Sequence, residues 1–308
     1  AAGSYTVIVT SESSYTTPTG SYTMEAAFEA GTLSGVEIEP NDTVPQQVSS
    51  GESIVGTISS TSDLDLYYIT ADAPGMLTIN FESDVSQSSG YEFGVFNIVD
   101  ESANVLISEV CDYSCSTSPS VGLSDAGYYF VVVGSESSYT TPSGSYTMVA
   151  TFEAGTPSGV EIEPNDTVPQ QVSSGESIVG TISSTSDLDR YSITTDAPGI
   201  LTVNFESDVS QSSGYRFSVV DGFDNVLISE VCDYSCSTSA SAGLSAAGSY
   251  TVIVTSESSY TTPSGSYTME ATYEAGTLLG VEIEPNDTVP QQVSSGESIV
   301  GTISSTSD

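Results

Sequence analysis

A long letter-for-letter repeat is the feature that most constrains how this chain folds. The stretch Gly35 to Asp65 recurs from Gly159 to Asp189, and it begins a third time at Gly280 and runs to Asp308. The first two copies start 124 residues apart (159 − 35), and the next two start 121 residues apart (280 − 159). A fixed period of this length is the signature of a tandem array of similar structural units.

The repeat predicts two complete modules flanked by two incomplete ones. Residues 35–158 and 159–279 form the complete modules, here called the first and the second module. Residues 1–34 are the C-terminal part of a truncated repeat, and residues 280–308 are the N-terminal part of another. Because the chain begins and ends inside a module, we expect it to be a window from a longer array.

The charge balance of the chain excludes several classes of partner. Only two basic residues, Arg190 and Arg216, stand against 41 acidic ones, and the formal net charge is −39. Phosphate contacts need Lys and Arg, so nucleic acid is excluded as a partner, and an anionic membrane surface is disfavoured for the same reason. Short alternating apolar runs favour a folded chain over a disordered acidic one, and no run is long enough for a membrane-spanning helix.

One module reads as a series of short strands separated by turn clusters, with no sustained helical period. The expected strands are rich in Val, Ile, Tyr, Phe and Thr and mostly alternate between apolar and polar residues. In the first module they are 52–58, 64–70, 75–82, 91–98, 104–110, 126–134 and 144–153. Seven to nine strands in about 120 residues predict an all-β fold, an antiparallel sandwich with one face of each strand buried.

The two complete modules differ most in one loop. Asn97 to Ala103 corresponds to the shorter stretch Asp221 to Asp224. A length change is tolerated best at the tip of a hairpin, so we place this loop there. Asp221-Gly222 is a turn signal, and a calcium-binding role for the loop is the weaker interpretation.

Four cysteines form one CDYSC pair in each complete module, Cys111/Cys115 and Cys232/Cys236. An even count in a Ser- and Thr-rich acidic chain indicates an oxidising, extracellular environment. We therefore expect a local disulfide in each module. Free thiols are the main alternative, whereas two cysteines without histidine cannot complete a zinc shell.

The pattern that carries chemistry in each module is E-x-E-P-N-D, followed by D-x-D. Residues two apart in an extended chain point the same way, so Glu37, Glu39 and Asn41 present oxygen ligands on one side. Pro40 favours this arrangement because it pushes the preceding residue into extended geometry. The D-x-D aspartates form a second same-side pair where a strand begins. The candidate ligands of the first module are Glu37, Glu39, Asn41, Asp42, Asp63 and Asp65.

If these groups converge, five carboxylates and one amide share a site without a cationic side chain. Two like charges about 4 Å apart repel by on the order of 1 kcal/mol in water and about 4 kcal/mol at a partly screened surface. Oxygen ligands alone favour a hard ion with flexible coordination, so we expect Ca²⁺ rather than magnesium or zinc. Five carboxylates carry −5, so one Ca²⁺ leaves −3 and two leave −1, which favours two ions in each complete module.

Two alternatives remain for this segment. The acidic residues could be solvated loops, as lone acidic runs usually are. Asn41 and its copies also begin an N-x-T sequon, so a glycan is the alternative to the ligand role.

These residues carry a resemblance to a known domain family. The module resembles the bacterial pre-peptidase C-terminal domain, whose relatives include the collagen-binding domains of clostridial collagenases. The resemblance rests on EPNDT, GTISSTSDLDLYYI, the glycine-led GMLTINF, AGYYFVVVG and the closing GSYTMVATFE. It covers the whole module, and it implies a jelly-roll-like β-sandwich of a secreted prokaryotic protein that holds calcium with its N-terminal segment.

By position, the resemblance implies calcium ligands in all three copies of the segment. In the first copy they are the six residues named above. In the second copy they are Glu161, Glu163, Asn165, Asp166, Asp187 and Asp189. In the third copy they are Glu282, Glu284, Asn286, Asp287 and Asp308. One departure is that the family domain usually accompanies a protease or another hydrolase, and no such domain is visible in this sequence.

Three functions compete, and an enzyme is the least favoured. Without histidine or lysine there is no Ser-His-Asp triad, no Ser-Lys dyad and no His-ligated metal. Carboxylate pairs can cleave glycosides, but paired acids that recur in every module fit a structural ion better. We expect the structural or adhesive repeat region of an extracellular surface fibre, with copies of itself as partners. The alternative is an array of accessory modules from a secreted hydrolase that binds collagen or polysaccharide.

We predict that the modules form an extended rod in solution. The connector 154–162 is short and runs directly into the proposed calcium ligands, so a bound ion should stiffen the joint. The high negative charge also resists collapse of one module onto another. A globular domain of this size has a radius of gyration near 14 Å, so each module should add roughly 35–45 Å of length. Small-angle scattering in millimolar calcium measures this length, and a compact particle would contradict the rod.

Overall fold

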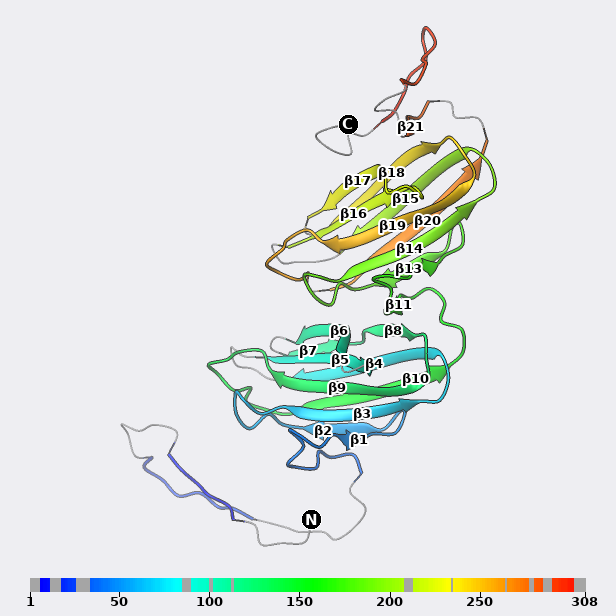
Figure 1. Ribbon diagram of the computed structural model, residues 1–308. Coiled ribbons are helices and arrows are strands. Elements are labelled where there is room, and N and C mark those ends of the chain that lie inside the picture. Colours follow the sequence, from blue (N-terminus) through cyan, green and yellow to red (C-terminus); the bar gives the residue numbers. More distant parts are fainter. Residues whose placement is uncertain are drawn as a thin grey trace. The chain divides into compact units, whose positions relative to one another are not determined.

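Every element of regular secondary structure in the described part of the computed structural model is a β-strand (Figure 1). The structure describes residues 6–11, 18–25, 34–84, 90–99, 102–111, 114–207, 213–233, 235–263, 265–276, 280–284 and 290–301. It divides into two units, Ala1–Leu33 and Ser34–Asp308, and each is considered by itself. Within these ranges, no helix is long and apolar enough to cross a membrane.

Two sheets face each other in the first module. One sheet has the order β1 (Gln46–Gln47), β3 (Asp65–Ala71), β9 (Gly127–Ser135), β5 (Tyr91–Val99) and β6 (Ser102–Cys111). The other has the order β11 (Ile162–Glu163), β8 (Ser120–Leu123), β4 (Gly75–Asp84), β10 (Tyr146–Ala154) and β2 (Ser53–Gly56), with β7 (Ser114–Thr117) also paired to β4.

The second module repeats this arrangement. Its first sheet has the order β12 (Gln170–Gln171), β14 (Leu188–Thr195), β19 (Gly248–Ser256), β16 (Tyr215–Val220) and β17 (Val226–Cys232). Its second sheet has the order β13 (Ser177–Gly180), β20 (Tyr267–Ala275), β15 (Gly199–Ser207), β18 (Cys236–Leu244) and β21 (Ile283–Glu284).

Alternating side chains explain why these strands form a sandwich. In β4, Leu77, Ile79 and Phe81 are fully buried, while the residues between them are more exposed. The ring of Phe81 stacks on Phe93 of the opposite sheet, with centroids 4.6 Å apart. The buried residues of each module form one hydrophobic cluster that draws on both of its sheets. The predicted all-β fold with sandwich modules is confirmed, while the residue boundaries of the predicted modules stay predictions.

All seven strands expected in the first module are present, and the structure adds three short ones, β1, β7 and β8. The longer strands pair antiparallel, as expected, and the structure adds short parallel pairings that the sequence did not predict. Four pairs of strands run parallel, namely β1 with β3, β8 with β11, β12 with β14, and β18 with β21. The parallel strands are only two residues long at the point of pairing. Periodicity needs a longer run than that to reveal a strand.

Strand pairing also joins consecutive modules. β11, which carries the start of the second acidic segment, pairs with β8 of the first module through Ile162–Gly122 and Glu163–Leu123. β21 of the third copy pairs with β18 of the second module in the same way. The second module and the third copy thus each begin with a short strand on the sheet edge of the module before it.

The loop and disulfide predictions are confirmed. The stretch Asp221 to Asp224 lies at the turn between β16 and β17. Its longer counterpart covers the end of β5 and the start of β6, together with residues 100–101, which lie outside the described residues. Cys111 and Cys115 are bonded to each other, as are Cys232 and Cys236. In each module the bond joins a strand of one sheet to a strand of the other.

An identical peptide adopts different structures in the two units. Residues 251–256 form most of β19, in which Val252 and Val254 are fully buried between β14 and β16. Residues 6–11 have the same sequence but no strand, and Val7 is 59% exposed. The strand therefore forms because of its neighbours in the sheet, not because of its own sequence alone.

Core truncation should destabilise one module at a time. Phe205 lies between Phe217 and Tyr267, with both ring centroids 5.1 Å away. We expect Phe205→Ala to lower the free energy of unfolding of the second module by about 3–5 kcal/mol. Removal of the disulfide by Cys232→Ser with Cys236→Ser should cost about 2 kcal/mol, because the closed loop is short. Denaturant unfolding of the full chain should show one transition shifted and the other unchanged; a shift of both would contradict two separate cores.

Candidate metal centre

Three carboxylates converge at the start of each complete module. In the second module, Glu161, Glu163 and Asp189 each place an oxygen atom within 4.8 Å of the others. Glu163 belongs to β11, and Asp189 lies at the start of β14. In the first module, Glu37, Glu39 and Asp65 form the corresponding group. The expected convergence of the E-x-E and D-x-D segments is thus present for these six residues.

The carboxylates of the second module are almost completely buried. The exposed fraction is 2% for Glu161, 5% for Glu163 and 0% for Asp189. Burial of a charged group is unfavourable unless the charge is paired or binds a metal. The two arginines of the chain are too few to neutralise such a group in every module. The site therefore needs either protons or a bound cation.

Protein donors satisfy only part of this group. Glu161 accepts hydrogen bonds at Oε1 from the Tyr191 hydroxyl (3.1 Å) and at Oε2 from the Thr181 backbone N–H (3.0 Å). Asp189 Oδ2 accepts a bond from the Tyr267 hydroxyl at 2.5 Å. Asp189 Oδ1 and Glu163 Oε1 are buried without a hydrogen-bond partner. Two carboxylate oxygens in the site thus stay available for a ligand.

The electrostatic consequence is a large rise in carboxyl pKa values. Burial, followed by repulsion from Glu161, raises the pKa of Glu163 to about 10. Burial also raises the pKa of Asp189 well above its usual value, again with Glu161 as the next cause. In the first module, burial and a hydrogen bond with Glu37 raise the pKa of Asp65 to about 9. Without a cation, these carboxyl groups hold protons at neutral pH.

The other predicted ligands of the second module lie beside the three-carboxylate group. Asn165 donates from its side-chain amide to Glu161 Oε1 (3.2 Å) and from its backbone N–H to Glu163 Oε2 (3.2 Å). Asp187 Oδ2 accepts from the N–H and the hydroxyl of Ser183, at 2.6 and 2.8 Å. Asp166 Oδ1 accepts from the backbone N–H of Leu188 at 3.1 Å.

A small cavity opens next to these residues. Its volume is about 180 Å³, and its lining includes the carboxylates of Glu163, Asp166 and Asp187. Asn104 and Val105 of the first module line the same cavity. The predicted ligands thus fall into two groups that share Glu163, one buried and one beside an open space. This division suits two cations better than one.

The first copy of the segment has the same bonds from backbone N–H groups to its carboxylates. Asp63 Oδ2 accepts from the backbone N–H of Ser59 at 2.5 Å, and Asp42 Oδ1 accepts from that of Leu64 at 3.2 Å. Asn41 is 1% exposed, and both polar atoms of its side-chain amide lack a partner. An unpaired buried amide is costly, and a bound cation would satisfy its oxygen.

The third copy is described only in part. Glu284 is buried. Glu282 lies next to β21. The remaining predicted ligands of this copy, Asn286, Asp287 and Asp308, lie outside the described residues.

Sequence reasoning missed the tyrosines that support the site. Tyr267 of β20 donates to Asp189 and contacts the hydroxyl of Tyr191 at 2.5 Å. Tyr146 of β10 likewise donates to Asp65 at 2.5 Å and contacts the hydroxyl of Tyr67 at 2.6 Å. Both donors come from the opposite sheet and lie about 80 residues beyond their aspartates. The only sequence signal is a Tyr in each closing GSYTM strand, which alone reads as a core residue.

The donor set fits a hard divalent cation. All groups that converge are carboxylate, amide or hydroxyl oxygens, which are the ligands of Ca²⁺ and Mg²⁺. The buried oxygens without partners are the second observation that fits a cation. No sulfur or imidazole ligand belongs to the described group, so the softer metals are a poorer match.

Comparison with known proteins gave structural similarities alone. No family model matches the chain, and no curated protein matches it. Similar solved structures include the pre-peptidase C-terminal domain of a Bacillus anthracis collagenase, at 10% identity and a TM-score of 0.27, over 35% of this chain and 94% of that one. They also include the CBM22-1–CBM22-2 tandem of Paenibacillus barcinonensis Xyn10C, at 8% identity and a TM-score of 0.25, over 73% of this chain and 83% of that one. A secreted protein from Eubacterium rectale matches at 14% identity and a TM-score of 0.26, over 82% of this chain and 87% of that one.

The raised pKa values predict an unusual pH dependence for the metal-free protein. In the unfolded chain the carboxyls of Asp and Glu ionise near pH 4, whereas in the folded chain those of Asp65 and Glu163 keep their protons to about pH 9 and 10. Between these limits the folded state binds more protons, so the free energy of unfolding falls as pH rises. In chelator, we expect a lower melting temperature at pH 8 than at pH 5.

Isosteric variants test the origin of this slope. Asp65→Asn combined with Glu163→Gln should make the melting temperature in chelator depend less on pH, because the substituted groups no longer titrate. Asp196→Asn, which removes an exposed carboxylate in the turn before β15, should leave the pH dependence of the melting temperature unchanged. If the two variant proteins show equal slopes, the general negative charge of the chain rather than the site causes the effect.

Proposed function

We propose that this chain is the repeat region of an extracellular, calcium-stabilised surface fibre, built from modules of the pre-peptidase C-terminal type. The observation that carries the proposal is the recurrence of the same three-carboxylate group at the start of each complete module, fully buried in the second. A group that recurs unchanged along an array suits a structural role that every module needs. The E-x-E-P-N-D and D-x-D motifs, which place these carboxylates, are also the basis of the assignment to this module type.

Calcium is the proposed ion because the site is rich in oxygen ligands and irregular. The groups come from three places in the chain, the β11 segment, the turn around Asn165 and the start of β14. Ca²⁺ accepts six to eight oxygen ligands in flexible geometry, whereas Mg²⁺ demands a near-ideal octahedron. We propose one ion at the three-carboxylate group and a second beside Glu163, Asp166 and Asp187.

Pairing between modules supports the fibre. β11 and β21 each add to the sheet edge of the preceding module, so the backbone connection recurs at both described junctions. Calcium bound by the residues of these strands would hold the junctions together. An extracellular location agrees with the two disulfides. The proposed partners are further copies of the same module along or between fibres.

The proposal assigns no catalytic reaction to the modules. The carboxylates of the site serve as hydrogen-bond acceptors for the backbone and for tyrosines, and the most buried ones face the protein interior. A glycosidase needs its two carboxyl groups on opposite sides of an accessible sugar. A structural cation site requires no such access.

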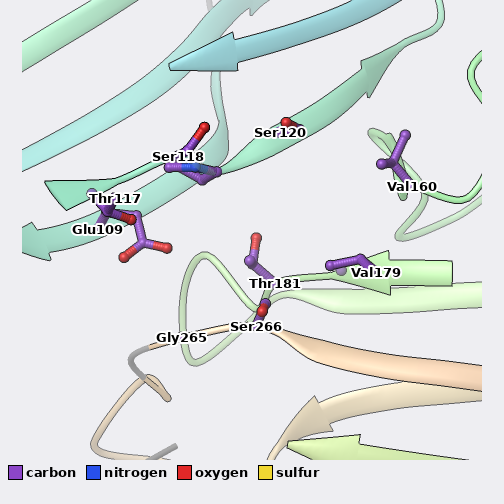
Figure 2. Close-up of a pocket in the computed structure, with 11 residues that line it drawn as sticks. Glu109, Thr117, Ser118, Ser120, Val160, Val179, Thr181, Gly265 and Ser266 are labelled. Carbon is purple, nitrogen blue, oxygen red and sulfur yellow. The ribbon is translucent and has the colours of Figure 1, made fainter. Parts of the chain in front are cut away.

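The second candidate is an array of accessory modules that binds collagen or polysaccharide for a secreted hydrolase. One observation favours it, a cavity of about 450 Å³ at the junction of the two complete modules. Figure 2 shows Glu109, Thr117 and Ser120 on one side of it. Thr181, Gly265 and Ser266 lie on the other side. A recess lined by Ser and Thr hydroxyls would suit a long polar polymer.

Calcium should stabilise the full chain. An ion that binds only the folded state adds RT ln(1 + [L]/Kd), which is about 2.7 kcal/mol at a hundredfold excess over Kd. We therefore expect a higher melting temperature in millimolar calcium than in chelator. Differential scanning calorimetry measures both modules in one experiment.

Paired variants connect this shift to the site. Glu161→Gln with Glu163→Gln should abolish the calcium-dependent shift of the second module and leave that of the first. Glu153→Gln with Glu274→Gln, which removes two exposed carboxylates, should leave both shifts intact. Melting curves that overlay in calcium and in chelator would refute calcium binding. Electron microscopy then separates the two functions, because end-to-end filaments support the fibre, whereas single particles that bind collagen or polysaccharide support the accessory array.

A further inference from the structure

We propose that each module completes the cation site of the module that follows it, so that ion binding and the docking of neighbouring modules are coupled. This inference rests on the proposed cation site and adds its partner, the preceding copy of the module. It comes from a comparison that the chain itself provides. The segments Gly35 to Asp65 and Gly159 to Asp189 have the same sequence, but only the second follows a described complete module.

Among the predicted ligands of these copies, burial differs most at the two glutamates and less at Asp42 and Asp166. Asn41 and Asn165 are both 1% exposed, and the D-x-D aspartates of both copies are buried as well. Glu39, in contrast, is exposed, whereas Glu163 is buried, and Glu37 changes from half-buried to buried in the same way. A module thus buries its asparagine and aspartates by itself. The burial of its two glutamates accompanies contact with the module before it.

The strand contacts explain this difference. The N–H of Glu161 donates to Val179 O of its own module at 2.9 Å, while its carbonyl accepts from the N–H of Gly122 in the first module at 2.6 Å. Ile162 and Glu163 then pair with Gly122 and Leu123. The backbone that carries both glutamates is therefore held between two modules. In the first copy, the corresponding N–H of Glu37 bonds to its own module through Val55 O at 3.0 Å.

The third copy repeats the arrangement. The N–H of Gly243 in the second module donates to the carbonyl of Glu282 at 2.7 Å, and Ile283 pairs with Gly243. Glu284 is buried there, as Glu163 is. Both described segments that follow a complete module are thus held by the same strand pairing, and Glu284 is covered as Glu163 is, while Glu282 stays half-buried.

The preceding module also reaches the second group of ligands. Val105 of β6 accepts a hydrogen bond from the Ser183 hydroxyl at 3.1 Å. The same hydroxyl and the N–H of Ser183 donate to Asp187. Asn104 and Val105 line the cavity that Glu163 and Asp187 share. One residue thus connects the hairpin of the first module with a candidate ligand of the second.

These contacts make the ion and the neighbour mutually dependent. Docking of the preceding module positions the two glutamates and removes water from them, which strengthens their attraction to a cation. Linkage requires the reverse effect to be equal, so the cation must strengthen docking by the same factor. The loss of groups that orient metal ligands typically reduces metal affinity about 10–100-fold, and we expect the loss of docking to have an effect of this size.

Gly122 offers a way to break the docking without touching a ligand. A Cβ atom at this position would lie 2.8 Å from the carbonyl oxygen of Glu161 and 2.8 Å from the side chain of Ile162. Gly122→Val should therefore displace the β11 segment. Val121 and Leu123 on either side of it pack in the core of the first module. Because successive side chains of a strand point to opposite faces, a side chain at position 122 points away from that core. The matched control is Gly243→Val, which disturbs the equivalent contact with the third copy.

The experiment uses the full chain with calcium binding restricted to the second module. Glu37→Gln with Glu39→Gln and Glu282→Gln with Glu284→Gln weaken the other two sites. Titration calorimetry with Ca²⁺ then compares this protein with its Gly122→Val and Gly243→Val derivatives. We expect Gly122→Val to raise the dissociation constant about 10–100-fold and Gly243→Val to leave it unchanged. Hydrogen exchange of the Gly122 N–H should also become slower when calcium is added.

The outcomes separate this inference from the proposed function. If the starting protein binds no calcium, the cation site itself is wrong. If it binds calcium and Gly122→Val has the same dissociation constant as Gly243→Val, the site is complete without its neighbour and the coupling is wrong. Calcium-independent exchange at Gly122 would overturn the coupling in the same way.

Discussion

Repulsion among buried carboxylates is the constraint on which the rest of this structure depends. Glu161, Glu163 and Asp189 bring oxygen atoms within 4.8 Å of one another in a place that water barely reaches. At such a distance two charges repel by about 4 kcal/mol even where solvent screens them partly. A protein with two basic side chains cannot relieve this repulsion from within at every module. Protons or divalent cations from the solution must do so, which ties the stability of each module to its surroundings.

The hydrophobic core and the polar site are built from the same strands. Tyr267 stacks on Phe205 with one face and donates its hydroxyl to Asp189, so a core aromatic residue also orients a carboxylate. Tyr146 plays the same part for Asp65 in the first module. Because these tyrosines are held by packing, their hydroxyl groups are positioned before any ion arrives. Preorganisation of this kind lowers the entropy cost of ligand binding.

The junction between modules is built from the same residues as the carboxylate site. A two-residue strand is too short to be stable alone, yet β11 pairs with Gly122 and Leu123, and Glu161 just before it is bonded to Val179 on one side and to Gly122 on the other. Glu161 and Glu163 of this segment are the glutamates that require a counter-ion. Cohesion between neighbours and neutralisation of charge therefore depend on the same few residues. An array with many copies of this junction would respond to the divalent ions around it at every joint.

The sequence by itself determined the features that repeat or alternate. The tandem modules, the seven strands expected in the first module, the local disulfides and the E-x-E and D-x-D carboxylates all follow from spacing and composition, because these properties depend on nearby residues. Only the tertiary structure decided the parallel two-residue pairings, the tyrosine donors from the opposite sheet and the burial of Glu163. These features join residues that are distant in sequence, and no local pattern records such contacts. The peptide TVIVTS is an example, since it forms a buried strand at residues 251–256 between two partner strands and no strand at residues 6–11. The difference lies in its partners and not in its sequence.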